Sequence, residues 1–164
     1  MEERLKPIHI KGYEELDVYD DIGIISDSEN RTRAYIKIQE GCNRFCTYCV
    51  IPYARGKVRS RDFDEIISEA EQLIKAGYKE LVLTGINTAL YDMENKNERK
   101  PQLYGVEKII AALDKMQGDF RVRLSSLEPA VVNADYVKRL LKYEKLRNHQ
   151  HISTQSGSND ILCA

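Results

Sequence analysis

The chain has few cysteines, no long apolar run and almost no net charge, and each shortage narrows the class of protein. Three of the four cysteines lie between Cys42 and Cys49, so a disulfide framework is not expected. No apolar run approaches the roughly eighteen residues that a membrane-spanning helix needs. The start of the chain, Met1 to Lys6, lacks the apolar segment of a secretory signal. We therefore expect a cytoplasmic protein that does not contact a membrane.

The net charge is −1, so no overall positive field indicates nucleic-acid binding. Any nucleic-acid contact must come from a local patch or from a part of the protein outside this chain. The 164 residues are 42% hydrophobic and 31% charged, which is ordinary for one globular domain or part of a larger one. Residues 1–32 are weakly patterned and acidic, and we interpret them as a linker or N-terminal arm. Residues 92–101 are expected to form a charged surface loop.

Hydrophobic periodicity in the rest of the chain predicts alternating strands and helices. Asp62 with Glu65 forms a capping box at one helix start, Gly77 ends that helix, and Asn133 is the expected N-cap of another. The order β-α-β-α-β-α-β predicts a parallel sheet with right-handed crossovers. The expected strands are 34–39, 80–84, 120–125 and 149–154, and the expected helices are 62–76, 106–116 and 134–141.

Cys42, Cys46 and Cys49 form a C-x3-C-x2-C array on one short stretch. Clustered thiolates are soft ligands that select zinc, copper(I) or iron–sulfur clusters. Three cysteines would leave one iron of a 4Fe–4S cluster free to bind a substrate. The alternatives are unrelated core cysteines, or a zinc site completed by His149 or His151. Cys163, near the end of the chain, is interpreted as incidental.

Polar residues follow every predicted strand. In β/α folds, functional sites form at the carboxyl ends of the strands, so these groups are expected to converge on one site. The groups are the three cysteines, Thr84–Asn87, Ser125–Pro129 and Gln155–Ser158. The alternatives are a plain strand-end turn at Gly85 and hydroxyls satisfied by the backbone at Ser125 and Ser126.

Two further polar features have open interpretations. Arg55, Lys57, Arg59 and Arg61 form a basic run that either grips phosphates or is a solvated face pairing with Asp62 and Asp64. His149 and His151 lie on one face of a predicted strand. We favour a polar barrel-lining role for the two histidines over zinc ligation.

The cysteine array, with Tyr48 before its last cysteine, resembles the signature of radical S-adenosylmethionine (SAM) enzymes. The flanking stretches Arg33–Cys42 and Tyr48–Gly56 are similar to those of the methylthiotransferases. Leu83–Asn87 and Leu124–Pro129 resemble the branch that acts on N6-threonylcarbamoyladenosine in tRNA. The resemblance covers nearly the whole chain.

The resemblance implies a role for each candidate residue. Cys42, Cys46 and Cys49 would ligate the 4Fe–4S cluster, whose free iron would chelate SAM. Electron transfer to SAM would yield a 5′-deoxyadenosyl radical. The SAM contacts would come from Tyr48 beside the adenine, from Thr84, Gly85 and Asn87 near the methionine amino group, and from Ser125, Glu128 and Gln155.

It also implies a transferase that adds a 2-methylthio group to threonylcarbamoyladenosine at tRNA position 37. The implied partners are tRNA and a cellular electron donor. Two alternatives remain within the family, namely the isopentenyladenosine and ribosomal-protein branches. A third, from another class, is a non-enzymatic iron–sulfur or zinc module.

The implied fold is α/β, a partial β/α (TIM-like) radical SAM barrel truncated to about four parallel strands and three helices in residues 33–164. The family's N-terminal methylthiotransferase domain, with its second 4Fe–4S cluster, and its TRAM domain are expected to be absent. We therefore expect the chain alone not to modify tRNA, although slow SAM cleavage is possible. Several positions depart from the family pattern, including Asp92 where glycine is common, Ser153 where proline is frequent, and polar Gln150 and Thr154.

Overall fold

The computed structural model describes residues 19, 32–94 and 104–163. The expected arm at 1–32 therefore lies almost wholly outside the described residues, as does the 95–101 part of the expected charged loop. The elements that position the site are β1 (Arg33–Glu40), α1 (Ile51–Arg55), β2 (Arg59–Ser60), α2 (Phe63–Lys75), β3 (Glu80–Gly85), η2 (Thr88–Leu90), α3 (Tyr104–Lys115), β4 (Arg121–Leu124), β5 (Ser126–Leu127), η3 (Pro129–Val131), α4 (Ala134–Leu140), β6 (His151–Ile152) and α5 (Asn159–Leu162).

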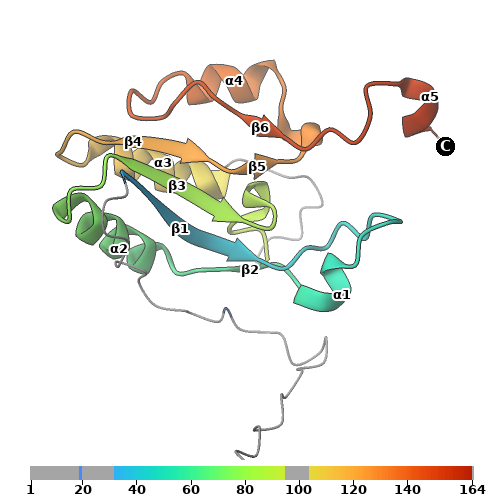
Figure 1. Ribbon diagram of the computed structural model, residues 1–164, viewed down its shortest axis with the longest axis horizontal. Helices are drawn as coiled ribbons and strands as arrows, with labels where there is room; N and C mark the ends of the chain where they lie inside the picture. Colours follow the sequence, from blue (N-terminus) through green and yellow to red (C-terminus); the bar gives the residue numbers. More distant parts are fainter. Residues whose placement is uncertain (1–18, 20–31, 95–103, 164) are drawn as a thin grey trace, which may run out of the picture.

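A curled four-stranded sheet in the order β2-β1-β3-β4 forms the centre of the molecule. β1, β3 and β4 run parallel, as predicted, and their arrowheads point to the same edge in Figure 1. β2 was not predicted, and it pairs antiparallel with β1. The parallel strands alternate with helices, so the predicted partial β/α barrel is confirmed.

The predicted fourth parallel strand, 149–154, is only partly correct. Within it, only His151–Ile152 forms a strand, and this pairs in parallel with β5 rather than β4. Beside β4, Val122 instead forms an isolated parallel bridge with Leu146. Val122 pairs with Leu146, and Ser126 pairs with His151. The segment from Leu146 to His151 is one residue longer than the segment from Val122 to Ser126, so the pairing between the two segments is interrupted as at a β-bulge.

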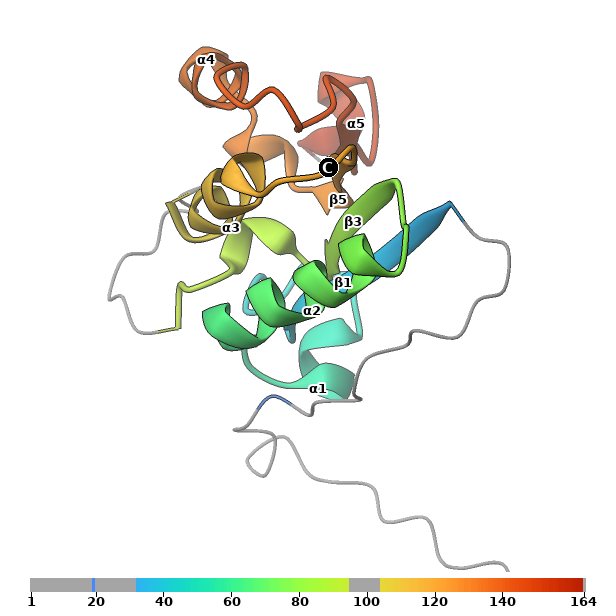
Figure 2. The ribbon, with the colours of Figure 1, turned by 90° about the vertical axis from the view of Figure 1, so that its left-hand side faces the viewer.

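The helices α2, α3 and α4 lie along one side of the strands (Figure 2). α2 starts at the predicted N-cap, since the Asp62 carboxylate accepts bonds from the backbone NH of Asp64 at 2.8 Å and of Glu65 at 3.2 Å. The Glu65 half of the predicted capping box is not formed, because the Glu65 carboxylate lies 3.5 Å from Arg61 Nε instead. The Asn133 side chain likewise caps α4 through the NH of Tyr136, at 2.9 Å. The core between helices and sheet contains the fully buried side chains Ile36, Ile38, Ile66, Leu73, Leu81, Leu83, Ile109, Ile110 and Leu113.

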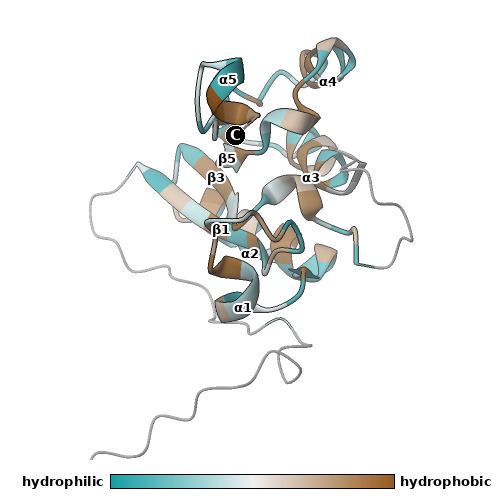
Figure 3. Ribbon diagram, turned by 90° about the vertical axis from the view of Figure 1, so that its right-hand side faces the viewer, coloured by the Kyte–Doolittle hydropathy of each residue, from teal (hydrophilic) through white to brown (hydrophobic). Residues whose placement is uncertain are grey.

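The third predicted helix buries less than its pattern suggested. Tyr136 and Leu140 are buried as expected, but Val137 is 44% exposed and Leu141 61% exposed. The helix has seven residues and contacts the core along a narrow stripe, so the flanking apolar residues face outward. Apolar residues are also exposed on α5, which is partly teal and partly brown in Figure 3. In the described part of the chain, no helix is long and apolar enough to cross a membrane.

Candidate active site

The loop that carries the three cysteines starts directly after β1 and is closed at its base. Gly41 has φ 71°, and an added Cβ would lie 1.7 Å from the carbonyl oxygen of Lys57. The next residue, Cys42, donates its backbone NH to the carbonyl of Gly56 at 3.1 Å. Only glycine combines this left-handed conformation with so close an approach. The two ends of the loop are therefore held against each other.

A buried ion pair strengthens this closure. Arg59 and Glu40 lie 2.8 Å apart, and each side chain is only 6% exposed. Arg59 also donates to the backbone carbonyls of Arg55 at 3.0 Å and Lys57 at 3.2 Å. A buried charge is tolerated when it is paired and hydrogen-bonded, as here. Arg59 thus ties the end of β1 to the returning end of the cysteine loop.

At Arg59 and Arg61, the basic run is neither a phosphate-binding strip nor a solvated face, the two interpretations that the sequence left open. Arg61 is buried too, and it pairs with the buried Glu69 of α2. Of the run, only Arg55 and Lys57 are exposed. Both buried arginines neutralise carboxylates inside the fold, so they do not form a phosphate-binding strip or a solvated face.

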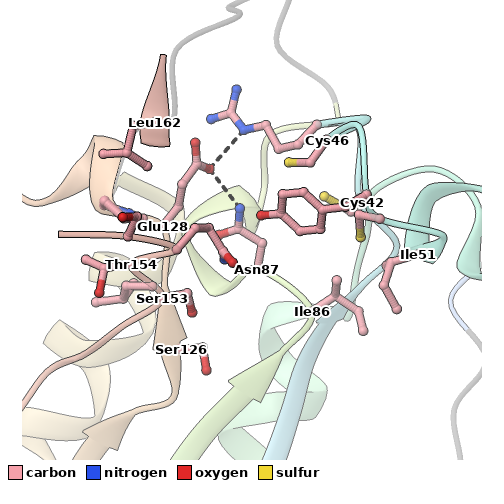
Figure 4. Close-up of a pocket in the computed structure, with 17 residues that line it drawn as sticks. Cys42, Cys46, Ile51, Ile86, Asn87, Ser126, Glu128, Ser153, Thr154 and Leu162 are labelled. Carbon is pink, nitrogen blue, oxygen red and sulfur yellow. Dashed lines mark hydrogen bonds and ion pairs between the residues drawn. The ribbon is translucent and has the colours of Figure 1, made fainter. Parts of the chain in front are cut away.

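A pocket of about 520 Å³ opens at the carboxyl ends of the strands. The three cysteines lie on one wall, and the ends of β3, β5 and the segment after β6 form the rest. Figure 4 shows Cys42 and Cys46 on the side opposite Ser153 and Thr154. Its lining is Cys42, Arg44, Cys46, Tyr48, Cys49, Ile51, Ile86, Asn87, Ser126, Leu127, Glu128, Pro129, Ser153, Thr154, Gln155, Ser156 and Leu162.

The structure gathers most, but not all, of the predicted cofactor-binding residues in this pocket. Tyr48, Asn87, Glu128 and Gln155 line it together with the cysteines. Three predicted residues lie elsewhere. Thr84 and Gly85 line a neighbouring hollow of about 340 Å³. Ser125 lies in a third hollow of about 210 Å³.

His149 and His151 line the same hollow as Ser125, on the inner face of the strands. Both side chains are exposed there, and neither lines the cysteine pocket. This placement agrees with the favoured barrel-lining role. It gives no support to a zinc site shared with the cysteines.

A polar network that the sequence did not predict crosses the pocket. Glu128 accepts a hydrogen bond from Arg44 Nε and another from Asn87 Nδ2, each at 2.9 Å and both on Oε2 (Figure 4). Asn87 Oδ1 is buried and has no hydrogen-bond partner among the described residues. A carboxylate and an orphaned amide oxygen together suit a ligand that brings N–H donors and positive charge. Arg44 was missed, although its place between two cysteines was a signal.

The donor chemistry of the pocket fits an iron–sulfur cluster. Three free thiols face one cavity, and thiolates are the ligands that such clusters use. Among residues 32–94 and 104–163, no three His, Cys, Asp or Glu side chains are already grouped tightly enough to hold a metal. Cluster binding would therefore draw the cysteines together on their local loop.

The three thiols differ in their surroundings. Cys42 is buried at the base of the loop, whereas Cys46 is exposed. Burial raises the pKa of the Cys42 thiol, and charge on Cys46 and Cys49 adds to this effect. A backbone hydrogen bond at Arg44 opposes it.

We expect alkylation of the metal-free protein with iodoacetamide to modify Cys46 and Cys163 first and Cys42 last. Only the thiolate reacts, and Cys42 combines poor access with a raised pKa. Because the pKa of Cys42 is raised, its rate should keep rising as the pH is increased above the ordinary range for a cysteine thiol. Peptide mapping by mass spectrometry at successive times gives the order. Equal rates at Cys42 and Cys163 would mean that the loop is open at its base.

The α/β half-barrel and the three-cysteine pocket at its strand ends define a class of β/α domain with a thiolate-lined site, and comparison with known families identifies that class. The model of the radical SAM superfamily matches residues 36–163. The chain belongs to the radical SAM superfamily.

Several curated relatives are tRNA-modifying enzymes. The chain is 46% identical over 151 residues to the threonylcarbamoyladenosine tRNA methylthiotransferase MtaB of Bacillus subtilis, covering 92% of this chain and 31% of that protein. It is 39% identical to the protein of the same name from Thermotoga maritima, covering 82% of this chain and 30% of that one. The tRNA-2-methylthio-N(6)-dimethylallyladenosine synthase of Clostridium tetani is 37% identical, with 85% and 30% covered. The chain thus spans about a third of the length of these relatives.

A solved structure supports the fold. The radical S-adenosylmethionine methyltransferase TsrM from Kitasatospora setae aligns with a TM-score of 0.58 at 18% identity. The alignment covers 79% of this chain and 23% of that one. At this identity, the likeness concerns the fold alone.

Proposed function

We propose that residues 33–164 form the first part of the radical SAM domain of a tRNA methylthiotransferase, and that residues 1–32 are the arm that leads into it. The pocket carries this proposal, because it brings Cys42, Cys46 and Cys49 together with Asn87 and Glu128. These five residues come from the ends of three different strands. Their convergence is what binding one cofactor and one co-substrate side by side requires.

In this proposal, Cys42, Cys46 and Cys49 hold a 4Fe–4S cluster. The cluster supplies the electron for reductive cleavage of SAM. Glu128 and the free Asn87 Oδ1 accept hydrogen bonds from the amino group of SAM. Tyr48 is 69% exposed at the pocket rim, where its ring is available to stack on the adenine.

The Arg44–Glu128 ion pair also takes part in the proposed binding of SAM. Its side chains are 28% and 24% exposed, so the pair sits at the boundary between pocket and solvent. An incoming ammonium group competes with Arg44 for the same carboxylate. Arg44 is then free to meet the carboxylate end of an amino acid, which guanidinium groups bind well.

We further propose that the substrate of the whole protein is threonylcarbamoyladenosine at position 37 of tRNA. This choice rests on sequence identity, which is 46% to a relative named as a threonylcarbamoyladenosine enzyme and 37% to one named as a dimethylallyladenosine enzyme. The sulfur would come from a second cluster outside this chain, and electrons from a cellular donor. The net charge of −1 implies that the main tRNA-binding surface also lies outside this chain.

Anaerobic reconstitution tests the cofactor part. We expect about four irons and four sulfides per chain, and a change in the spectrum of the reduced cluster when SAM is added. A single tetrahedral zinc without any response to SAM would instead establish the non-enzymatic module.

The substrate part needs cells that lack the full-length gene. We expect their tRNA to lose 2-methylthio-threonylcarbamoyladenosine and to keep its unmethylthiolated precursor, as read by nucleoside mass spectrometry. Loss of the isopentenyl analogue would assign the protein to the other tRNA branch. Unchanged nucleosides in a strain without a second such enzyme would contradict both.

A further inference from the structure

The side chain of Gln39, near the end of β1, lies inside the fold between two parts of the site. It is 0% exposed. Its Nε2 donates to the backbone carbonyls of Glu40 at 2.6 Å and Gly41 at 2.7 Å. Its Oε1 accepts the backbone NH of Asn87 at 3.0 Å. One buried amide therefore joins the start of the cysteine loop to the turn that carries Asn87.

The chemistry of these contacts requires an amide at this position. The two carbonyls need a group with two donors, and the NH of Asn87 needs an acceptor. A carboxylate would repel both carbonyls, and an apolar side chain would leave the buried backbone NH of Asn87 without the acceptor that Gln39 supplies. In the observed orientation, both ends of the Gln39 amide are satisfied.

Gly85 packs directly against this bridge. An added Cβ at Gly85 would lie 2.9 Å from the backbone oxygen of Gln39 and 3.0 Å from its Oε1. The register of β1 and β3 places these two residues opposite each other, at the point where the ladder is irregular. The lack of a side chain at Gly85 thus allows the Gln39 amide to reach Asn87.

We infer that Gln39 is a positioning residue that holds the Gly85–Asn87 turn at a set distance from the cysteine loop, and so sets the affinity of the pocket for SAM. This inference rests on the proposed function. Gln39 does not line the pocket, and it acts only through Asn87 and the start of the loop.

The two sides of the bridge differ in their other anchors. The cysteine loop is also held by the Cys42–Gly56 backbone bond and by the Glu40–Arg59 ion pair. The Asn87 NH, by contrast, has Gln39 Oε1 as its acceptor within the described residues. The Asn87 side chain also bonds to Glu128 at 2.9 Å, but that contact does not fix the backbone. Removal of the bridge should therefore loosen the backbone of the Asn87 turn and leave the cysteine loop closed.

The test compares Gln39→Met with the unchanged chain after anaerobic reconstitution. Methionine keeps the length of the side chain and removes its hydrogen bonds. We expect iron and sulfide contents equal to those of the unchanged chain. We expect the Kd for SAM to rise about tenfold or more, because the buried NH of Asn87 loses its acceptor on Gln39 and the backbone at Asn87 is no longer held in place. The SAM-dependent change in the paramagnetic resonance spectrum of the reduced cluster should weaken in parallel.

Tyr91→Phe is the matched control. It also removes one buried hydrogen bond, from the Tyr91 hydroxyl to the backbone of Arg61 at 2.9 Å, and Tyr91 does not line the pocket. General loosening of the fold would affect both variants, whereas the inferred role predicts an unchanged Kd for Tyr91→Phe. Gly85→Ala crowds the same bridge from the other side, so it should reproduce the loss of SAM affinity with full iron content. It provides the test if Gln39→Met does not fold.

The outcomes are distinct. If the unchanged chain binds a cluster but no SAM, the proposed function is wrong. If it binds SAM, and neither Gln39→Met nor Gly85→Ala weakens that binding, the inference is overturned. Loss of iron together with SAM would also overturn it, since Gln39 would then be needed for the cysteine loop itself.

Discussion

Replacement of Gly41 by alanine is expected to destabilise the protein by roughly 3 kcal/mol or more and to prevent normal assembly of the cluster. An alanine Cβ would lie 1.7 Å from the Lys57 carbonyl oxygen, and this contact is backbone against backbone. No rotamer change can relieve it, so the returning end of the loop must move. The Cys42–Gly56 bond would break with it. Urea unfolding followed by circular dichroism gives the loss of stability, and iron analysis gives the loss of cluster.

Substitution of two other glycines separates the effect of backbone strain from that of the steric contact. Gly77 has φ 92° and nothing within 4 Å of an added Cβ, so Gly77→Ala should cost only about 1 kcal/mol of backbone strain. Gly157 also has open space around it and no positive φ, so Gly157→Ala should change the stability by less than about 0.5 kcal/mol. If Gly41→Ala were no worse than Gly77→Ala, the close contact at the base of the loop would not constrain the chain.

Replacement of Cys46 by alanine is expected to reduce reductive cleavage of SAM to the background without protein. The variant should fold normally, because Cys46 is exposed at the far end of the loop and supports no core contact. It loses one of the three proposed cluster ligands, however. The measurements are iron content and formation of 5′-deoxyadenosine with dithionite and SAM under anaerobic conditions.

Cys163→Ala is the matched control for this experiment. Cys163 is also an exposed free cysteine, but it does not line the pocket. We expect full iron content and unchanged cleavage from this variant. Retained cleavage in Cys46→Ala, or loss of the cluster in Cys163→Ala, would show that the ligand set has been assigned wrongly.

The amino-acid sequence alone determined those features that depend on neighbouring residues. The three cysteines lie on one loop because their spacing leaves them no other arrangement. The caps at Asp62 and Asn133 form because side-chain oxygens meet NH groups two or three residues away. Glycine is common in the family at the position of Asp92. Asp92 has φ 60°, so it keeps the left-handed conformation that glycine would adopt freely.

The tertiary structure decided the features whose partners are distant in sequence. In the sequence, Arg59 and Arg61 resemble part of a basic surface. In the structure they are buried, because they pair with Glu40 and Glu69 in the interior. The predicted fourth strand divides because its register against β4 and β5 differs by one residue, which no local pattern records. The Gln39 amide and the Arg44–Glu128 pair bridge 48 and 84 positions of sequence. Local spacing specifies the caps and the three-cysteine loop, whereas only the pairing of the strands determines which buried charges and amides meet.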